Sequence, residues 1–197
     1  MKVFKATRAD MACTMGKGTF QYELGKTYTA EGCRCGRTGL HTCEYVLGCM
    51  GYYPLDGKNR FFLAEASGDI HEIGGDDTRV SSTKLRLLKE LSIMEICYEA
   101  LSYMIHHPKR EWEVHGTNLS AEKDIVRGGG RGFLGIARGS EPVIQGKLGA
   151  VLGMAQEQDG EIVNARIIYI DGERYLPDTQ YKLTKEGLLV RREVLEE

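Results

Sequence analysis

Residues 33–53 read CRCGRTGLHTCEYVLGCMGYY, and we expect the fold to be organised around this stretch. It holds four of the six cysteines, one of the five histidines, and a tyrosine pair that is followed by Pro54. Gly39–Cys43 is expected to form a short strand, and Glu44–Tyr52 a short helix with an apolar face. The residues before the stretch are typical of strands, and those after it are typical of sheet and scaffold.

Length and charge limit the class of protein. A chain of 197 residues suits one large domain or two small ones. The net charge of -2 and the isoelectric point near 6.2 argue against a nucleic-acid binder that relies on bulk positive charge. No apolar run approaches the roughly 20 residues that span a bilayer, so we expect no membrane association.

The N-terminus and the cysteines suggest the compartment. The first ten residues, MKVFKATRAD, lack the apolar core of a signal peptide. Six cysteines without such a signal indicate a reducing compartment, in which thiols stay free or bind metal. We therefore expect a cytoplasmic protein.

Alternation of apolar and polar residues predicts a mixed or antiparallel N-terminal sheet. Arg60–Ile73 is expected to form a long strand with a bulge at Gly68, and Thr78–Leu88 to return antiparallel after a turn at Gly74–Asp77. Three shorter strands are expected earlier in the chain, at Lys2–Thr7, Phe20–Leu24 and Thr27–Ala30.

The clearest helix is expected over Ser92–His107. Ser92 and Glu95 match a capping box, which satisfies two backbone donors at a helix start. Apolar residues then recur at helical spacing, and Pro108 follows the helix as a stop signal. We expect this helix to pack on the N-terminal sheet.

Glycine dominates the segment Gly128–Gly153, which follows a polar connection over residues 109–127. A phosphate-binding loop would need a preceding strand, a following helix and a G-x-G-x-x-G or Lys-Ser/Thr pattern, and Phe133 breaks that pattern. The segment is better interpreted as tight, repetitive β structure with glycines at the corners, either a small solenoid or a compact meander.

The C-terminal residues predict antiparallel hairpins. Asp159-Gly160 and Asp171-Gly172 are Asp-Gly pairs, which favour type I′ turns; the second is expected to lead into a strand at Glu173–Leu176. A last hairpin is expected across residues 185–187, and Ile167, Tyr169, Tyr181 and Leu183 are expected to face the core. The fold class is thus α+β and β-dominated, with an N-terminal domain over 1–108, a connection over 109–127, and a Gly-rich β region with a C-terminal antiparallel meander over 128–197.

A metal site is the first candidate for chemistry. Cys33, Cys35, His41 and Cys43 offer three thiols and an imidazole within eleven residues, and zinc takes four sulfur or nitrogen ligands. The C-x-C and H-x-C spacings are tighter than the usual C-x2-C of zinc knuckles. In a strand, however, His41 and Cys43 would share a face.

Two other interpretations of the cysteines stay open. Cys43, Cys49 and Cys97 are first interpreted as small buried hydrophobic residues, as free cysteines usually are. A catalytic pair would instead use Cys13 or Cys35 as nucleophile and His41 as base, in hydrogen-bond contact.

Aromatic residues suggest a binding surface. Phe20, Tyr22, Tyr52 and Tyr53 are candidates for an aromatic wall against a base or ring. The alternative is that they are ordinary core and rim residues.

The sequence carries the motifs FKA, FQYE-x-GK-x-Y, C-x5-GLH-x-C, YYP, R-F, SGDI, DDT and S-T-K-L-R. Together these motifs resemble an uncharacterised domain family that is widespread in phages and prophages. They lie at Phe4–Ala6, Phe20–Tyr28, Cys33–Cys43, Tyr52–Pro54, Arg60–Phe61, Ser67–Ile70, Asp76–Thr78 and Ser82–Arg86, and a C-terminal pattern at Asp171–Leu183 matches as well. The resemblance covers most of the chain and implies a phage-type protein, located in the host cytoplasm, without implying an activity.

A more distant resemblance lies in the order of elements. The expected order is a strand ending in FKA, then a GLHTC segment that leads to a helix, then a long strand. This order is similar to that of ADP-ribosyltransferase-type folds. This resemblance implies NAD as cofactor and Lys5, His41, Thr42 and Glu65 as catalytic positions. Lys5 stands where the family has arginine, and Thr42 and Cys43 replace its Ser-Thr-Ser element.

We therefore expect an accessory protein that acts by binding a host or defence factor, without catalysis and without a cofactor. An ADP-ribosyltransferase-like or NAD-cleaving enzyme is the first alternative, and a structural zinc module the second. A protein partner is expected, self-association is open, and bulk binding of nucleic acid is not expected.

Overall fold

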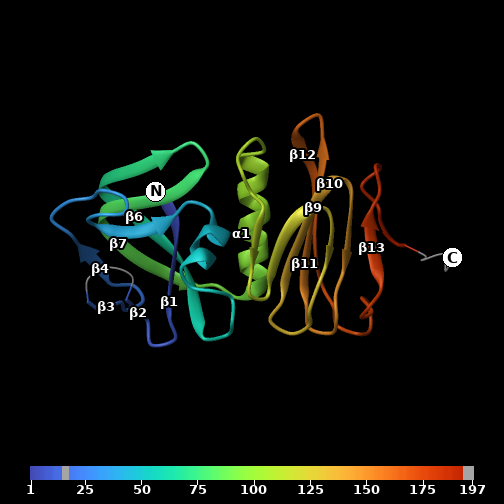
Figure 1. Ribbon diagram of the computed structural model, residues 1–197, viewed down its shortest axis with the longest axis horizontal. Coiled ribbons are helices and arrows are strands. Elements are labelled where there is room, and N and C mark those ends of the chain that lie inside the picture. The colour runs from blue at the N-terminus through green and yellow to red at the C-terminus, as the bar shows by residue number, and fades with distance from the viewer. Residues whose placement is uncertain (15–17, 193–197) are drawn as a thin grey trace. The chain divides into compact units, whose positions relative to one another are not determined.

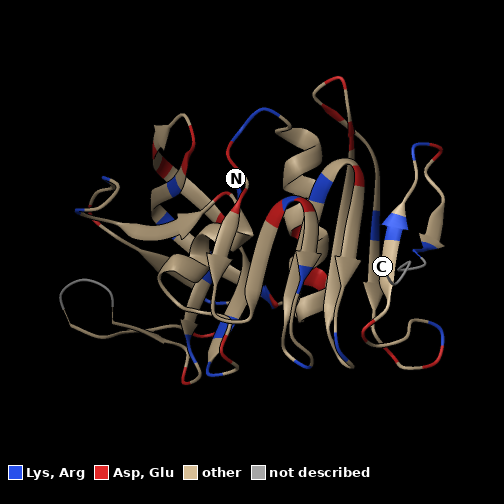
Figure 2. Ribbon diagram, turned by 45° about the vertical axis from the view of Figure 1, so that its right-hand side comes forward, with Lys and Arg blue, Asp and Glu red and all other residues tan. Residues whose placement is uncertain are grey.

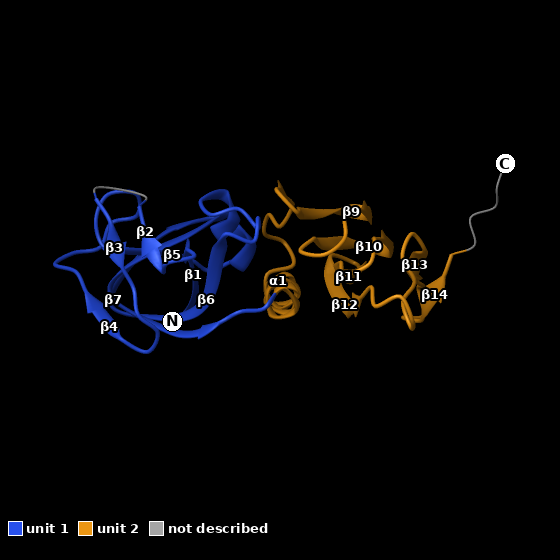
Figure 3. Cartoon of the chain, turned by 90° about the horizontal axis from the view of Figure 1, so that it is seen from below, with its two compact units in different colours: residues 1–92 blue, residues 93–197 orange. Residues whose placement is uncertain are grey.

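The computed structural model describes residues 1–14 and 18–192 (Figure 1). The chain divides into two compact units, Met1–Ser92 and Ile93–Glu197 (Figure 3). Strands dominate both, so the β-dominated α+β class is confirmed. No helix in the described part of the chain is long and apolar enough to cross a membrane.

Unit 1 consists of strands and one short 3-10 helix. Its strands are β1 (Lys2–Arg8), β2 (Ala12–Cys13), β3 (Phe20–Gln21), β4 (Thr27–Thr29), β5 (Leu40–Cys43), β6 (Asn59–Gly74) and β7 (Asp77–Glu90). The 3-10 helix η1 (Val46–Gly51) follows β5 and buries Val46, Leu47, Cys49 and Met50. The strand and helix expected within residues 33–53 are both present.

The main sheet of unit 1 closes on itself. Its order is β4-β7-β5-β1-β6, and β6 also pairs with β7, so β7, β5, β1 and β6 form a small barrel. Every pair in it is antiparallel. Phe4 lies at the centre, opposite Cys43 on one side and Leu63 on the other, and is 3% exposed. The predicted sheet is thus antiparallel rather than mixed.

The bulge expected at Gly68 is present. The register of β6 on β7 shifts between Ser67 and Ile70, and Gly68 has a φ of 74°. A Cβ at Gly68 would lie 2.3 Å from Thr83 Oγ1, which accepts a hydrogen bond from the Asp69 amide. Only glycine fits this close approach without strain.

Unit 2 contains the long helix and the second sheet. Its elements are α1 (Ile93–His106), β8 (Val114–Gly116), β9 (Leu119–Arg127), β10 (Leu134–Gln145), β11 (Val151–Gln158), β12 (Glu161–Tyr169), β13 (Gln180–Leu183) and β14 (Leu189–Arg191). The sheet is mixed, because β10 pairs in parallel with both β9 and β11.

The Gly-rich segment forms two short parallel coils. Leu134 lies in register between Leu119 and Val151, and the connections over residues 128–133 and 146–150 carry most of the glycines. Asp124 has a φ of 61°, at the point where β9 turns a corner and its register on β10 shifts. Consecutive strands that stack in parallel across such short connections make a small solenoid, one of the two arrangements expected.

The helix α1 packs on the second sheet, so its predicted place on the N-terminal sheet is wrong. Its closest contacts in unit 2 are with β10, β11 and β12. A Cβ on Gly153 of β11 would lie 2.8 Å from Cys97 Sγ. The apolar stripe is buried as expected, at Ile96, Cys97, Ala100, Leu101 and Met104. Helical periodicity identifies the buried face of a helix but not the sheet that covers it.

Two of the three expected C-terminal hairpins are confirmed, but the single meander is not. Asp159 and Gly160 have φ values of 53° and 82°, as a type I′ turn between β11 and β12 requires. β13 pairs with β14 as expected, yet its other neighbour is β10. No strand forms over residues 173–176, which follow the second Asp-Gly pair as a turn.

One face of β12 was predicted wrongly. Ile168 is 2% exposed, whereas Tyr169, which was expected in the core, is 44% exposed. Apolar residues occur on both faces of this edge strand, so its alternation does not say which face is buried. Tyr181 and Leu183 lie in the core as expected.

Candidate functional site

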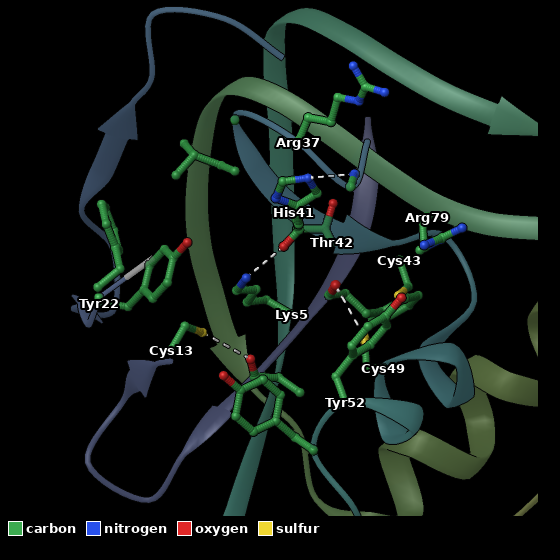
Figure 4. Close-up of a pocket in the computed structure, with 18 residues that line it drawn as sticks. Lys5, Cys13, Tyr22, Arg37, His41, Thr42, Cys43, Cys49, Tyr52 and Arg79 are labelled. Atoms are coloured by element: carbon green, nitrogen blue, oxygen red, sulfur yellow. Dashed lines mark hydrogen bonds between the residues drawn. The ribbon is translucent and has the colours of Figure 1, made fainter. Parts of the chain in front are cut away.

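A cavity of about 360 Å³ opens in unit 1 beside β1, β5 and η1 (Figure 4). Its volume lies at the lower end of the range of small-molecule pockets. Residues of three chemical kinds line it: basic and polar (Lys5, Arg37, His41, Thr42, Arg79), aromatic (Phe4, Phe20, Tyr22, Tyr52, Tyr53) and thiol (Cys13, Cys43, Cys49).

Lys5 extends from the barrel strand β1 toward the centre of the cavity. Its Nζ donates a hydrogen bond to the backbone oxygen of His41 (2.7 Å) and lies 5.3 Å from the centre of the Tyr22 ring. An ammonium group has three N–H donors, and this bond uses one of them. Lys5 is thus held in place with donors left for a ligand.

His41 lies opposite on β5 and is neutral at pH 7. Its pKa is lowered, first by burial and then by the positive charge of Lys5. Nε2 accepts a hydrogen bond from the Gly36 amide (3.0 Å), which leaves the proton on Nδ1. His41 therefore adds no charge to the cavity.

Two arginines complete the basic part of the lining. Arg79 Nε lies 2.9 Å from Asp77 Oδ1, and this pairing raises the pKa of the arginine and lowers that of the carboxyl. Arg37, by contrast, makes no salt bridge within residues 1–14 and 18–192.

The charges in the cavity favour an anion. No carboxylate occurs among the described residues that line it. Asp77, which does not line the cavity, neutralises the charge of Arg79. The described residues of the lining include no carboxylate that would neutralise the charges of Lys5 and Arg37. Elsewhere basic and acidic residues are interspersed along both units (Figure 2), as the small net charge predicts. The cationic character is thus a local property of the cavity.

The four predicted aromatic residues all line the cavity. The rings of Phe20 and Tyr22 are 4.8 Å apart, and both also contact Tyr28, at 5.3 and 5.2 Å. Burial raises the pKa of Tyr22, whereas Phe20 remains 40% exposed. Phe20 is therefore available to a ligand ring, with Tyr22 and Tyr28 behind it.

The three thiols of the lining come from β2 (Cys13), β5 (Cys43) and η1 (Cys49). Cys49 Sγ donates to the Phe4 oxygen at 3.4 Å, and Figure 4 draws the Cys43 side chain next to it. The neighbouring Cys49 thiol lowers the pKa of Cys43, and the Cys43 thiol together with burial raises the pKa of Cys49. Cys13 Sγ donates instead to the Ala6 oxygen, at 3.4 Å.

The predicted zinc ligands are not brought together. Cys35 Sγ donates to the backbone oxygen of His71 (2.9 Å), whereas Cys43 lines the cavity, which Cys33 and Cys35 do not. The described residues contain no group of three or more His, Cys, Asp or Glu side chains placed to hold a metal ion. Zinc stays a prediction from the sequence, which metal analysis of the purified protein can test.

The residues expected of an enzyme are only partly gathered. Lys5, His41 and Thr42 line the cavity, but Glu65 is exposed on β6 and is not part of the lining. The Nε2 atom of His41, the expected base, is bonded to the Gly36 amide.

Sequence reasoning missed the two arginines of the lining. Arg37 lies in the loop before β5 and Arg79 near the start of β7, so the two are far apart in the sequence. Only the pairing of β5 with β7 places Arg79 opposite Cys43. The one local signal was the spacing of Asp77 and Arg79, which lie two residues apart on one strand and could therefore form an ion pair.

Comparison with known proteins supports an uncharacterised domain family for the first half of the chain. No curated protein and no solved structure is significantly similar to the chain. A family model does match, over residues 1–99, which include all of unit 1 and its cavity. The chain therefore belongs to the family described as domain of unknown function DUF7666.

Proposed function

We propose that the protein acts by binding, and that the cavity of unit 1 holds an anionic small molecule with an aromatic ring, of the nucleotide class. The observation that carries this proposal is the pairing of two uncompensated cations, Lys5 and Arg37, with an aromatic wall in one cavity. A phosphate group suits the cations, and a base suits the exposed face of Phe20.

The size of the cavity favours a mononucleotide. Its volume of about 360 Å³ is close to the lower limit for sites that hold small molecules. The accessory-protein prediction then takes a specific form, in which the protein sequesters a nucleotide. A host or defence factor as a direct protein partner remains a separate prediction, which a pull-down from host lysate tests.

Isothermal titration with AMP, adenosine and inorganic phosphate tests the proposal. We expect AMP to bind roughly tenfold to a hundredfold more tightly than adenosine, because hydrogen bonds to charged groups contribute about 1.5–3 kcal/mol. Inorganic phosphate alone should bind weakly, since it does not contact the aromatic wall. Equal affinities for AMP and adenosine would contradict the role of the cations.

Incubation with labelled NAD distinguishes the enzyme alternative from binding alone. Binding without turnover is the expected result. Cleavage of NAD or transfer of label, lost in a Glu65→Gln variant, would instead establish the ADP-ribosyltransferase-like activity.

A further inference from the structure

Cys43 and Cys49 lie against each other at the junction of β5 and η1. The short turn of η1 brings position 49 back toward the end of β5, and a Cβ built on Gly48 would lie 3.7 Å from Cys43 Sγ. Figure 4 draws the two side chains next to each other, and neither cysteine is part of a disulfide. Cys49 Sγ donates to the Phe4 oxygen at 3.4 Å, and Phe4 is the residue that pairs with Cys43 in the sheet, so this bond holds Cys49 close to Cys43.

The cavity gives access to this pair. Cys43 and Cys49 are 3% and 4% exposed, yet both line the cavity. Cys97 differs from them, because it is fully buried between α1 and β11 and does not line the cavity. A small oxidant that enters the cavity therefore meets the Cys43–Cys49 pair without unfolding of unit 1.

We propose that Cys43 and Cys49 are a redox-active dithiol, which a peroxide entering the cavity oxidises to an intramolecular disulfide. Two observations carry this inference: the two side chains lie next to each other, and both line the same cavity. It does not depend on the identity of any ligand of the cavity.

The reaction proceeds in two balanced steps. The Cys43 thiol gives up its proton and its sulfur attacks one oxygen of hydrogen peroxide; the O–O bond breaks, giving a Cys43 sulfenic acid and one water. The Cys49 sulfur then attacks the Cys43 sulfur, and the S–O bond breaks with loss of a second water. The two thiols lose two hydrogens and two electrons in total, which the peroxide takes up.

The disulfide would change the cavity itself. It would join the end of β5 to η1 and remove the S–H that Cys49 donates to the Phe4 oxygen. Phe4 lies opposite Cys43 in the sheet and also lines the cavity. Oxidation is therefore expected to alter binding in the cavity, whatever its ligand.

Peptide mapping of the full chain tests the inference. Reduced protein, freed of reductant, is treated with hydrogen peroxide, alkylated, cleaved after Glu44 and other glutamates without reduction, and analysed by mass spectrometry. Cleavage after Glu44 separates Cys49 from a peptide that holds Cys33, Cys35 and Cys43, so a linked pair in which fragmentation finds Cys33 and Cys35 alkylated reports the disulfide. We expect the Cys43–Cys49 link to be the main oxidised product.

Three variants sharpen the test. Cys49→Ser is expected to lose the disulfide and to leave a Cys43 sulfenic acid that dimedone traps, and Cys43→Ser is expected to lose both products. Cys13→Ser is the matched control, because Cys13 lines the same cavity but bonds to the Ala6 oxygen, and it should form the link at the wild-type rate.

Full alkylation of Cys43 and Cys49 in the wild-type protein after peroxide treatment would overturn the inference, as would a link from either residue to a different cysteine. The wild-type map is decisive even if a serine variant fails to fold. The outcome is also independent of AMP titration, so failure of nucleotide binding and failure of disulfide formation are distinguishable.

Discussion

At the scale of single residues, the site depends on which charges are compensated. His41 contributes hydrogen bonds but no charge, because burial and Lys5 lower its pKa. Arg79 is tied to Asp77, whereas Lys5 and Arg37 remain available. The sequence indicated Lys5, His41 and the aromatic residues as candidates. It did not indicate their charge states, since these depend on neighbours that are distant along the chain.

The lowered pKa of His41 gives a pH dependence of stability. The unfolded chain binds a proton at His41 near the ordinary pKa of about 6.5, above the folded pKa. The contribution of neutral His41 is therefore fully present above pH 6.5 and is lost as the pH falls through the folded pKa. Urea unfolding measures the free energy of unfolding at pH 7.5 and at pH 5.5. The decrease from pH 7.5 to pH 5.5 should be smaller for His41→Gln than for the wild type. An equal loss in both proteins would contradict this assignment.

Release of Arg79 from its carboxylate is expected to strengthen anion binding. In Asp77→Asn the guanidinium keeps its charge but loses its ion pair. We expect AMP affinity to rise by up to roughly fivefold, corresponding to about 1 kcal/mol for a partly exposed pair. Titration of the variant measures this effect. Unchanged or weaker AMP binding would show that Arg79 does not face the ligand.

At the scale of elements, local patterns identified the helix α1 and both C-terminal hairpins. They did not identify the sheet on which α1 packs, because an apolar stripe carries no information about its partner. The same limit applies to β12, whose two faces are similarly apolar. A small solenoid was one of the two arrangements predicted for the Gly-rich segment, and the register of its parallel strands depends on contacts between β9, β10 and β11.

The contact between α1 and β11 allows a packing test. Gly153→Ala places a Cβ 2.8 Å from Cys97 Sγ and 3.2 Å from Ile136 Cγ1, so we expect destabilisation of about 1–3 kcal/mol. Gly116→Ala is the control, because nothing lies within 4 Å of its Cβ position.

Urea unfolding compares the variants of this test. Addition of Cys97→Ala should recover part of the loss caused by Gly153→Ala, since it removes the sulfur that the new methyl group meets. Strictly additive effects of the two substitutions would show that Cys97 is not the residue displaced.

At the scale of the molecule, the β-dominated class followed from composition and alternation. The closure of unit 1 into a barrel could not be predicted in this way. It requires β6 to pair with β1 on one side and with β7 on the other, and alternation does not specify which strands pair. That closure places residues from β1, β5, η1 and β7 around one cavity. The stretch at residues 33–53 supplies much of this lining, as its concentration of Cys, His and Tyr suggested, but its role as a metal site was not supported by convergence of side chains.

The affinity for AMP after removal of one cation at a time tests the central claim most directly. We predict that Lys5→Gln and Arg37→Gln each weaken AMP binding roughly tenfold to a hundredfold and change adenosine binding much less. Lys58→Gln, which removes a lysine of unit 1 outside the cavity, should bind AMP like the wild type. AMP affinities of the Lys5 and Arg37 variants equal to that of the Lys58 variant would contradict the account.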